Sequence, residues 1–250
     1  MVAAPARGPG PHSIRIRFRR CAVSHSVLTS GALPGGLIVL PGVYQPQADT
    51  HFLAEALAQE DIGAGTDALE IGTGAGALAL QAAGRGARVT AVDVSWPAVA
   101  TARLNARRRR LPVRVLHGDF AERTAGRRFD LIVANPPYVP ASAARPPSRG
   151  PERAWDAGPD GRWIIDRICA RARTLLRPGG ALLMVHSAMC GPEETVDRLT
   201  GAGLAAGITA RTSVPWGPVL RSRRAWLEGQ GLAAEAEEWE ELVIIRAQSL

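Results

Sequence analysis

The sequence predicts an α/β protein built on a doubly wound, mostly parallel β-sheet. Short apolar runs alternate with longer helix-like segments through the middle of the chain, as in parallel strand–helix–strand units. A glycine-rich turn at 72–76 joins one of these runs to an alanine-rich segment, which is typical of the ligand-binding edge of such sheets. The length of 250 residues and the apolar fraction of 46% suffice for one domain of this class.

The start of the chain differs in composition from the rest. Residues 1–40 predict an N-terminal extension, partly disordered because its first residues are rich in Pro, Gly and Ala, while 41–250 predict the main domain. Apolar and basic residues alternate over 14–19, which predicts a short strand or hairpin, although a basic arm would show the same pattern. A further short strand is expected at 36–40.

The main domain is expected to alternate strands and helices. We expect strands at 67–71, 87–92, 113–116, 131–134, 181–186, 208–214 and 242–246. We expect helices at 46–62, 77–83, 95–108, 161–176 and 193–200, the first capped by Asp49 or Thr50. The last two strands have no clear helix between them, which predicts an antiparallel end to the sheet. Two long polar segments, 141–159 and 215–238, leave this pattern, and such segments often carry function.

The basic residues of the chain are all of one type. All 30 basic residues are arginines, against 23 acidic residues, which gives a net charge of +7. Because Ala, Gly and Pro are also abundant, a bias toward GC-rich codons explains most of this excess, and nucleic acid is the lesser interpretation. The one dense run, Arg107–Arg110, ends an expected helix, where cations also complement the helix dipole.

Cysteine usage and hydropathy point to an intracellular compartment. Cys21, Cys169 and Cys190 are far apart and form no Cys-x-x-Cys pair, so we expect neither a disulfide framework nor a metal site. No run of about eighteen apolar residues is present, so no membrane span or membrane partner is expected. We therefore expect a cytoplasmic protein.

The glycine-rich turn carries the first candidate ligand contacts. Glu70, Gly72, Gly74 and Gly76 alternate with other residues between an expected strand and an expected helix. Glycines permit a tight turn and let backbone N–H groups approach a ligand closely. The spacing differs from the Gly-x-Gly-x-x-Gly phosphate fingerprint, and a carboxylate at the strand end repels phosphates but attracts an amino group. A simple strand-to-helix turn would carry the same glycines.

The next two strands also end in acidic residues. Asp93 lies about twenty residues after the glycine turn, where a ribose diol binds in sheets of this kind. Asp119 and Phe120 follow the third strand, where a carboxylate can accept from an adenine amine and a phenyl ring can cover the base. Either acid could instead cap a helix. Because ligands of open α/β sheets bind at the carboxyl ends of strands, the three ends together fit S-adenosylmethionine better than a dinucleotide.

The fourth strand ends in a stiff polar tip, Asn135-Pro136-Pro137-Tyr138. Proline has no backbone N–H and fixes φ, so the strand cannot continue past Asn135. The tip presents the Asn135 amide and backbone carbonyls as hydrogen-bond acceptors, with the Tyr138 ring nearby. This array suits a flat group that bears N–H, such as an amide or an exocyclic base amine. An ordinary loop at a strand end is the alternative, because Asn-Pro is a common turn.

Taken together, these motifs resemble the class I S-adenosylmethionine-dependent methyltransferases of the HemK type. That family methylates the side-chain amide of glutamine in peptide-chain release factors, on a Rossmann-like sheet of about seven strands with the last one antiparallel. Residues 43–50 also resemble the segment before the first strand in the short archaeal and eukaryotic branch. The resemblance implies S-adenosyl-L-methionine as cofactor, S-adenosyl-L-homocysteine as product, and no metal.

The resemblance also assigns roles to individual residues. The catalytic residues it implies are Asn135, Pro136 and Tyr138. The cofactor-binding residues it implies are Tyr44, Thr50, Glu70, Gly72, Thr73, Gly74, Gly76, Asp93, Val94, Asp119, Phe120 and Asn135. The implied partners are a protein substrate carrying a glutamine and, as in the short branch, a small zinc-binding activator protein.

The methyl acceptor is not decided by these motifs. Several nucleic-acid methylases share the Asn-Pro-Pro-Tyr tip, so adenine or guanine is an alternative acceptor, and nucleic acid an alternative partner. The motifs also fit a small-molecule or peptide tailoring methyltransferase, or a scaffold that binds the cofactor without catalysis. Steep salt dependence of activity would favour nucleic acid, since phosphate contacts release counterions.

Overall fold

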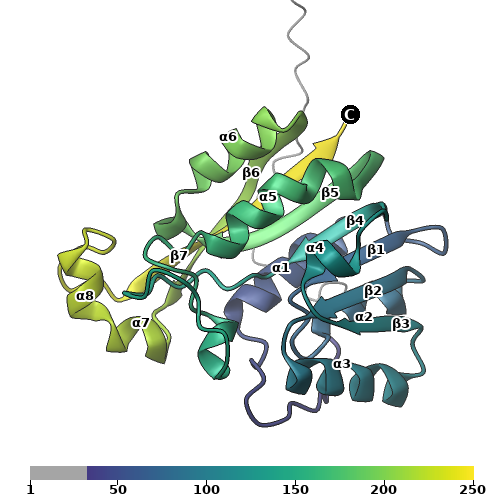
Figure 1. Cartoon of the computed structure of the whole chain (residues 1–250), viewed down its shortest axis with the longest axis horizontal. Helices are drawn as coiled ribbons and strands as arrows, with labels where there is room; N and C mark the ends of the chain where they lie inside the picture. The colour runs from purple at the N-terminus through teal and green to yellow at the C-terminus, as the bar shows by residue number, and fades with distance from the viewer. Residues whose placement is uncertain (1–32) are drawn as a thin grey trace, which may run out of the picture.

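A seven-stranded sheet runs through residues 33–250, the part of the chain that the computed structural model describes. Its strands are β1 (Asp67–Ile71), β2 (Arg88–Asp93), β3 (Val113–His117), β4 (Phe129–Ala134), β5 (Leu176–Ser187), β6 (Leu204–Pro215) and β7 (Trp239–Ser249). They lie in the order β3-β2-β1-β4-β5-β7-β6 (Figure 1). β1 to β5 pair in parallel, and β7 is antiparallel to both β5 and β6. The predicted doubly wound sheet with an antiparallel last strand is confirmed.

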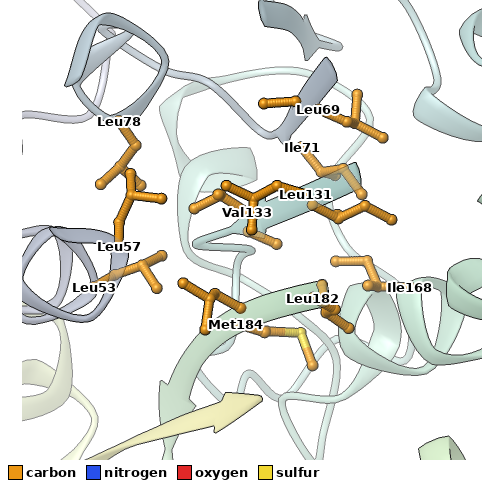
Figure 2. Close-up of a cluster of buried hydrophobic side chains, with 14 of the residues drawn as sticks. Leu53, Leu57, Leu69, Ile71, Leu78, Leu131, Val133, Ile168, Leu182 and Met184 are labelled. Carbon is orange, nitrogen blue, oxygen red and sulfur yellow. The ribbon is translucent and has the colours of Figure 1, made fainter. Parts of the chain in front are cut away.

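Helices connect the strands and cover both faces of the sheet. They are α1 (Ala48–Ala58), α2 (Ala77–Gly84), α3 (Trp96–Arg109), α4 (Phe120–Arg123), α5 (Trp163–Leu175), α6 (Pro192–Gly201), α7 (Pro218–Ser222) and α8 (Arg224–Gly229), with short 3-10 turns at Pro151–Ala154 and Ala188–Cys190. Figure 2 shows Leu53, Leu57 and Leu78 of α1 and α2 on one side of the central strands. Ile168 of α5 lies on the other side.

The hydrophobic core lies where the central strands meet these helices. Leu69, Ile132 and Leu182, on β1, β4 and β5, are completely buried. Each fully buried side chain of this size stabilises the fold by about 1.5–3 kcal/mol. The rigid sheet therefore fixes the carboxyl ends of β1, β2 and β4, which carry the predicted site residues.

Two expectations near the start of the domain are wrong. Residues 36–40 form no strand, because the backbone N–H and carbonyl of Ile38 bind the side-chain amide of Asn105 on α3, at 3.0 and 2.8 Å, instead of a neighbouring strand. The N-cap position of α1 is held by Gln47, whose side chain makes no capping hydrogen bond, and not by Asp49 or Thr50, which lie inside the first turn. The strand expected at 14–19 lies outside the described residues.

The second half of the chain also departs from the expected element bounds. β5 begins at Leu176, five residues before the expected strand, and continues through Pro178 and two glycines with a register shift against β4. A Cβ at Gly180 would lie 3.0 Å from the carbonyl of Phe129, so this close approach of β4 and β5 needs glycine. A short helix, α4, follows β3 where only a strand end was expected.

The segment 215–238 is a compact addition between β6 and β7. Figure 1 shows its helices α7 and α8 beside one end of β7. Trp216, Leu220 and Leu227 form a small buried cluster of their own in this segment. Arg223 donates to the carbonyl of Pro140 at 2.8 Å and pairs with Asp156 at 2.6 Å. The addition therefore braces the loop that leaves the Asn-Pro-Pro-Tyr tip.

The described residues hold no helix that is both long and apolar enough to cross a membrane. Within the same residues, no three His, Cys, Asp or Glu side chains are grouped to hold a metal ion. Cys169 and Cys190 are buried free thiols.

Candidate active site

A cleft with an empty volume of about 830 Å³, partly open to solvent, lies at the carboxyl ends of β1, β2 and β4. Here the strand order reverses, because the chain builds outward from β1 to β3 and then returns to place β4 on the other side of β1. Such a switch point leaves a crevice in which ligands of open α/β sheets bind. Residues from the segment before α1 and from 150–154 close the cleft from the outside.

Nine of the twelve residues predicted to bind the cofactor line this cleft. They are Tyr44, Thr50, Glu70, Gly72, Thr73, Gly74, Asp93, Val94 and Asn135. Gly76, Asp119 and Phe120 do not line it, and neither do Pro136 and Tyr138 of the predicted catalytic set. The structure thus brings together most of the predicted set, and the roles themselves stay predictions.

The glycine turn bends as its sequence predicts. Gly72 and Gly74 have φ of +72° and +51°, a region that residues with a side chain rarely adopt. Gly76 begins α2 with φ +84°, and a Cβ there would lie 3.2 Å from the Cβ of Ala102 on α3. Gly72 and Gly74 therefore shape the cleft wall, while Gly76 permits the close packing of α2 against α3.

Glu70 is both part of the cleft wall and a buried anchor for the turn. Its carboxylate accepts hydrogen bonds from the Thr73 hydroxyl and from the backbone N–H of Ala79 in the first turn of α2, the latter at 3.1 Å. Burial raises the pKa of Glu70 to about 8, although these two hydrogen bonds oppose the shift. The carboxyl group is therefore largely protonated at neutral pH, and a nearby cation would favour its ionisation.

Asp93 fixes the next strand end. Its two carboxylate oxygens accept from the backbone N–H of Gly74 at 2.9 Å and of Ser95 at 2.8 Å. Burial raises its pKa, and these backbone hydrogen bonds oppose that effect. Each oxygen keeps a further lone pair, so the carboxylate can still accept from a diol.

A buried carboxylate that the sequence analysis treated only as a helix cap organises the tip. Asp49 is 5% exposed and accepts hydrogen bonds from Asn135 Nδ2 at 3.0 Å, Tyr44 Oη at 3.1 Å and Tyr138 Oη at 3.2 Å. Asn135 Nδ2 also donates to Thr50 Oγ1 at 3.2 Å. Asp49 lies 86 residues from Asn135 in the chain, so no local signal could have revealed this contact.

These contacts fix which way the Asn135 amide points. The NH2 group of Asn135 faces α1, because Nδ2 donates both to the carboxyl group of Asp49 and to the hydroxyl of Thr50. The Oδ1 atom has no hydrogen-bond partner among the described residues and belongs to a side chain that lines the cleft. The tip therefore offers the cleft an acceptor and not a donor.

Tyr138 lies behind the tip instead of in the cleft. It is 8% exposed, and its ring belongs to the main hydrophobic core. Burial, together with the nearby carboxylates of Asp49 and Glu240, raises its pKa well above the ordinary tyrosine value. The neutral hydroxyl thus serves as a donor to Asp49.

Asp119 and Phe120 are engaged elsewhere. Asp119 caps α4 through the backbone N–H of Ala121 at 2.9 Å, and it pairs with Arg167 at 2.6 Å. Phe120 is buried, with the Arg167 guanidinium 5.4 Å from its ring centre. The helix-cap interpretation of Asp119 therefore describes its present contacts, and its adenine contact stays a prediction.

The long polar loop contributes residues that the site prediction omitted. Gly150, Pro151, Arg153 and Ala154 line the cleft opposite the strand ends. Arg153 donates to the carbonyl of Val94 at 3.3 Å and is the sole cation among the lining residues. The signal that could have found this segment is its length, since long loops inside compact domains are often functional.

The acidic side chains of the cleft fit S-adenosylmethionine. That molecule carries a sulfonium and an ammonium group, which favour a surface bearing Glu70 and Asp93. Its ribose diol needs an acceptor with a free lone pair, which Asp93 provides.

Comparisons with known proteins agree with this geometry. A family model described as "Methyltransferase small domain" matches residues 37–147. A Methanocaldococcus jannaschii protein, provisionally named a protein N5-glutamine methyltransferase, is 33% identical over 177 residues, 70% of this chain and 88% of that protein. The release factor glutamine methyltransferase of Mycolicibacterium smegmatis is 34% identical over 208 residues, 80% of this chain and 73% of that protein. Among solved structures, one chain of the E. cuniculi Mtq2–Trm112 complex superposes on this chain with a TM-score of 0.58 and 21% identity. The match covers 84% of this chain and 99% of the other, and that complex is described as responsible for methylation of the termination factor eRF1.

Proposed function

The chain belongs to the HemK family of protein N5-glutamine methyltransferases, and from this premise we propose that it methylates a glutamine side-chain amide in a peptide-chain release factor. Membership of this family makes it an S-adenosylmethionine-dependent methyltransferase. Its relatives from M. jannaschii and M. smegmatis carry names that specify glutamine, and the second specifies release factor. The proposal concerns the acceptor that this chain uses.

The orientation of Asn135 is the observation that carries the proposal. Its Nδ2 atom is held by Asp49 and Thr50, which leaves Oδ1 as the acceptor on the cleft side. A primary amide presents two N–H groups in one plane, so it needs two acceptors placed side by side. In the proposal these are Asn135 Oδ1 and the backbone carbonyl of Pro136.

The two acceptors would make a poor nucleophile reactive. S-adenosylmethionine supplies an electrophilic methyl group on its sulfonium sulfur. An amide nitrogen attacks slowly because its lone pair is delocalised. It gains positive charge as the new C–N bond forms and the S–CH3 bond breaks, which would leave neutral S-adenosylhomocysteine, and the methylated nitrogen would then lose one proton to water. Asn135 Oδ1 and the Pro136 carbonyl hold both N–H groups, aim the lone pair and stabilise that charge, each acceptor being worth about 2.7–4 kcal/mol. Correct placement of the two reactants lowers the barrier by a further 7–11 kcal/mol or so.

A small activator protein and a cytoplasmic location complete the proposal. The solved Mtq2–Trm112 structure contains a second protein beside the methyltransferase. By the resemblance to the short branch, we include a small zinc-binding activator as the partner of this chain. Release factors act in translation, so the enzyme would work in the cytoplasm. Adding such a partner to the purified chain should raise its activity or its solubility.

The direct test is methyl transfer from labelled S-adenosylmethionine to a purified release factor. We expect label on one glutamine of the release factor, located by mass spectrometry of its peptides, and none when that glutamine is replaced by glutamate. Parallel reactions with total RNA and with genomic DNA test nucleic acid as the acceptor. Label in nucleic acid and none in the release factor would replace the proposed substrate.

The Asn135→Ala variant provides the matched enzyme control. Losing one aligned acceptor should lower kcat by about 10² to 10³, since the interaction acts in the transition state. The dissociation constant for S-adenosylmethionine should stay within about threefold, because most of the cleft wall is unchanged. Full turnover by this variant would remove the tip from the reaction.

A further inference from the structure

Within the described residues, the excess of positive charge is concentrated in one segment, most of which lies at the β3 edge of the sheet. Residues 96–128, which form α3, β3 and α4, contain nine arginines and two carboxylates. The other described residues contain sixteen arginines and twenty-one carboxylates. A compositional preference for arginine would spread the cations evenly over the chain. The segment therefore has a net charge of +7, whereas the other described residues have a net charge of −5, so position and not composition explains this excess.

The arginines of this edge are not neutralised within the part of the chain that the structure describes. None of the nine pairs with a carboxylate there, whereas nine arginines outside 96–128 do. One of those, Arg167, neutralises Asp119, so only one carboxylate of the edge remains unpaired. Five of the nine are exposed and make no side-chain hydrogen bond to described residues: Arg107, Arg108, Arg110, Arg114 and Arg128. Exposed cations without acidic partners raise the local concentration of anionic ligands.

An exposed aromatic stack lies between these arginines and the cleft. Trp96 begins α3 and is 60% exposed, with one face stacked on His117 at 4.0 Å between ring centres and 11° between planes. Val94, two residues earlier, lines the cleft. β3 pairs only with β2, so it is the edge strand, and Figure 1 places α3 and β3 at the end of the sheet away from β6. Arg128 lies directly before β4 in the middle of the sheet, so we call the other four exposed arginines and Trp96 the basic edge.

We infer that the basic edge binds single-stranded nucleic acid outside the methylation cleft. Guanidinium groups gathered at the C-terminal end of α3 and at the start of the adjoining strand β3 can contact successive phosphates of one strand. The free face of Trp96 offers a platform for a base, and base stacking is the recurrent partner of basic grooves in single-strand binding. An acidic protein segment would satisfy the arginines but would have no use for the Trp96 stack. This inference goes beyond the proposed function and does not depend on it.

Fluorescence anisotropy with the full chain tests the inference. A labelled RNA of about 20 nucleotides, the same sequence as single-stranded DNA, and poly-glutamate are titrated over a series of salt concentrations. The double variant Arg107→Gln/Arg108→Gln should lower the slope of log Kd against log salt by about 1.4, since each lost phosphate contact in a single strand is worth about 0.7. Trp96→Ala should weaken binding about tenfold.

The matched control removes the same charge from another surface. Arg171 and Arg221 are exposed and form no ion pair with described residues, so Arg171→Gln/Arg221→Gln should leave the salt slope unchanged. The inference is supported if RNA, DNA or both bind and if this binding is lost selectively in the Arg107→Gln/Arg108→Gln variant. Which of the two binds more tightly then identifies the kind of nucleic acid. Equal losses in both double variants would show non-specific attraction and overturn it. So would binding of poly-glutamate as tightly as nucleic acid, or no binding at low salt.

Discussion

Asp49 offers the most direct test of how the tip is held. Replacing it by Asn keeps the size of the side chain but removes a carboxylate that accepts four side-chain hydrogen bonds at 3.0–3.2 Å. The new amide could turn its own NH2 group toward the tip. Asn135 could then rotate by half a turn and present N–H, instead of Oδ1, to the acceptor amide.

The structure sets the size of the effect. A donor in place of an aligned acceptor loses about 2.7–4 kcal/mol of transition-state stabilisation, so kcat should fall by about 10² to 10³. Asp49 does not line the cleft, so the dissociation constant for S-adenosylmethionine should change by less than about threefold. The free energy of unfolding should fall by about 1–3 kcal/mol, because buried hydroxyl groups lose a charged acceptor.

Three measurements separate a positioning role from a structural one. Steady-state kinetics with the release factor give kcat and KM, calorimetry gives the affinity for S-adenosylmethionine, and thermal unfolding reports stability. Asp67→Asn is the matched control, because Asp67 pairs with Arg88 and Arg177 at the opposite end of β1. That control should lose some stability and no kcat. A folded Asp49→Asn enzyme with kcat within threefold of the wild type would refute the reasoning.

Three further predictions follow from buried groups and close contacts. Affinity for S-adenosylmethionine should rise between about pH 6 and pH 8, because burial holds the pKa of Glu70 at about 8 and the cationic ligand favours the ionised form of Glu70. Calorimetry should find no such dependence on pH in Glu70→Gln, and a wild-type affinity that does not change with pH would contradict the prediction. Burial raises the pKa of Glu240 from 4.5 to about 7, so the contribution of this side chain to stability is lost as pH rises through 7. Glu240→Gln should therefore raise the free energy of unfolding by up to about 3 kcal/mol at about pH 8 and change it little near pH 4. Denaturant titrations that give equal effects at the two pH values would argue against this. Gly76→Ala should lower the free energy of unfolding by about 1–3 kcal/mol, because φ at this position is +84° and the new Cβ would lie 3.2 Å from Ala102. Gly63→Ala is the matched control: its Cβ would meet nothing within 4 Å, so thermal unfolding should show almost no change.

The elements that follow short-range rules could be predicted from the sequence. The run 131–134 is apolar and is stopped by two prolines, and the structure ends β4 at Ala134. The helix expected at 95–108 is α3 to within one residue, because Pro97 suits the first turn of a helix, and Ser95 occupies the N-cap position. The residues that decide each of these boundaries are neighbours in the chain.

Expectations fail where the deciding partner is distant in sequence. The run 36–40 is apolar enough for a strand, yet Ile38 finds its hydrogen-bond partner 67 residues away, in the side chain of Asn105. β5 begins early because Gly180 lets it pack closely against Phe129 of β4. Neither contact leaves a periodic signal in the sequence.

The same division holds in the site. The sequence alone determined that Glu70, the glycines, Asp93 and Asn135 stand at neighbouring strand ends, because parallel strands place their carboxyl ends on one edge. Tertiary structure alone decided which atom of Asn135 faces the cleft, by bringing Asp49 from another element to within 3.0 Å. Periodicity and turn chemistry fix where a strand stops, whereas a side chain's orientation depends on donors and acceptors that meet only when distant segments pack together.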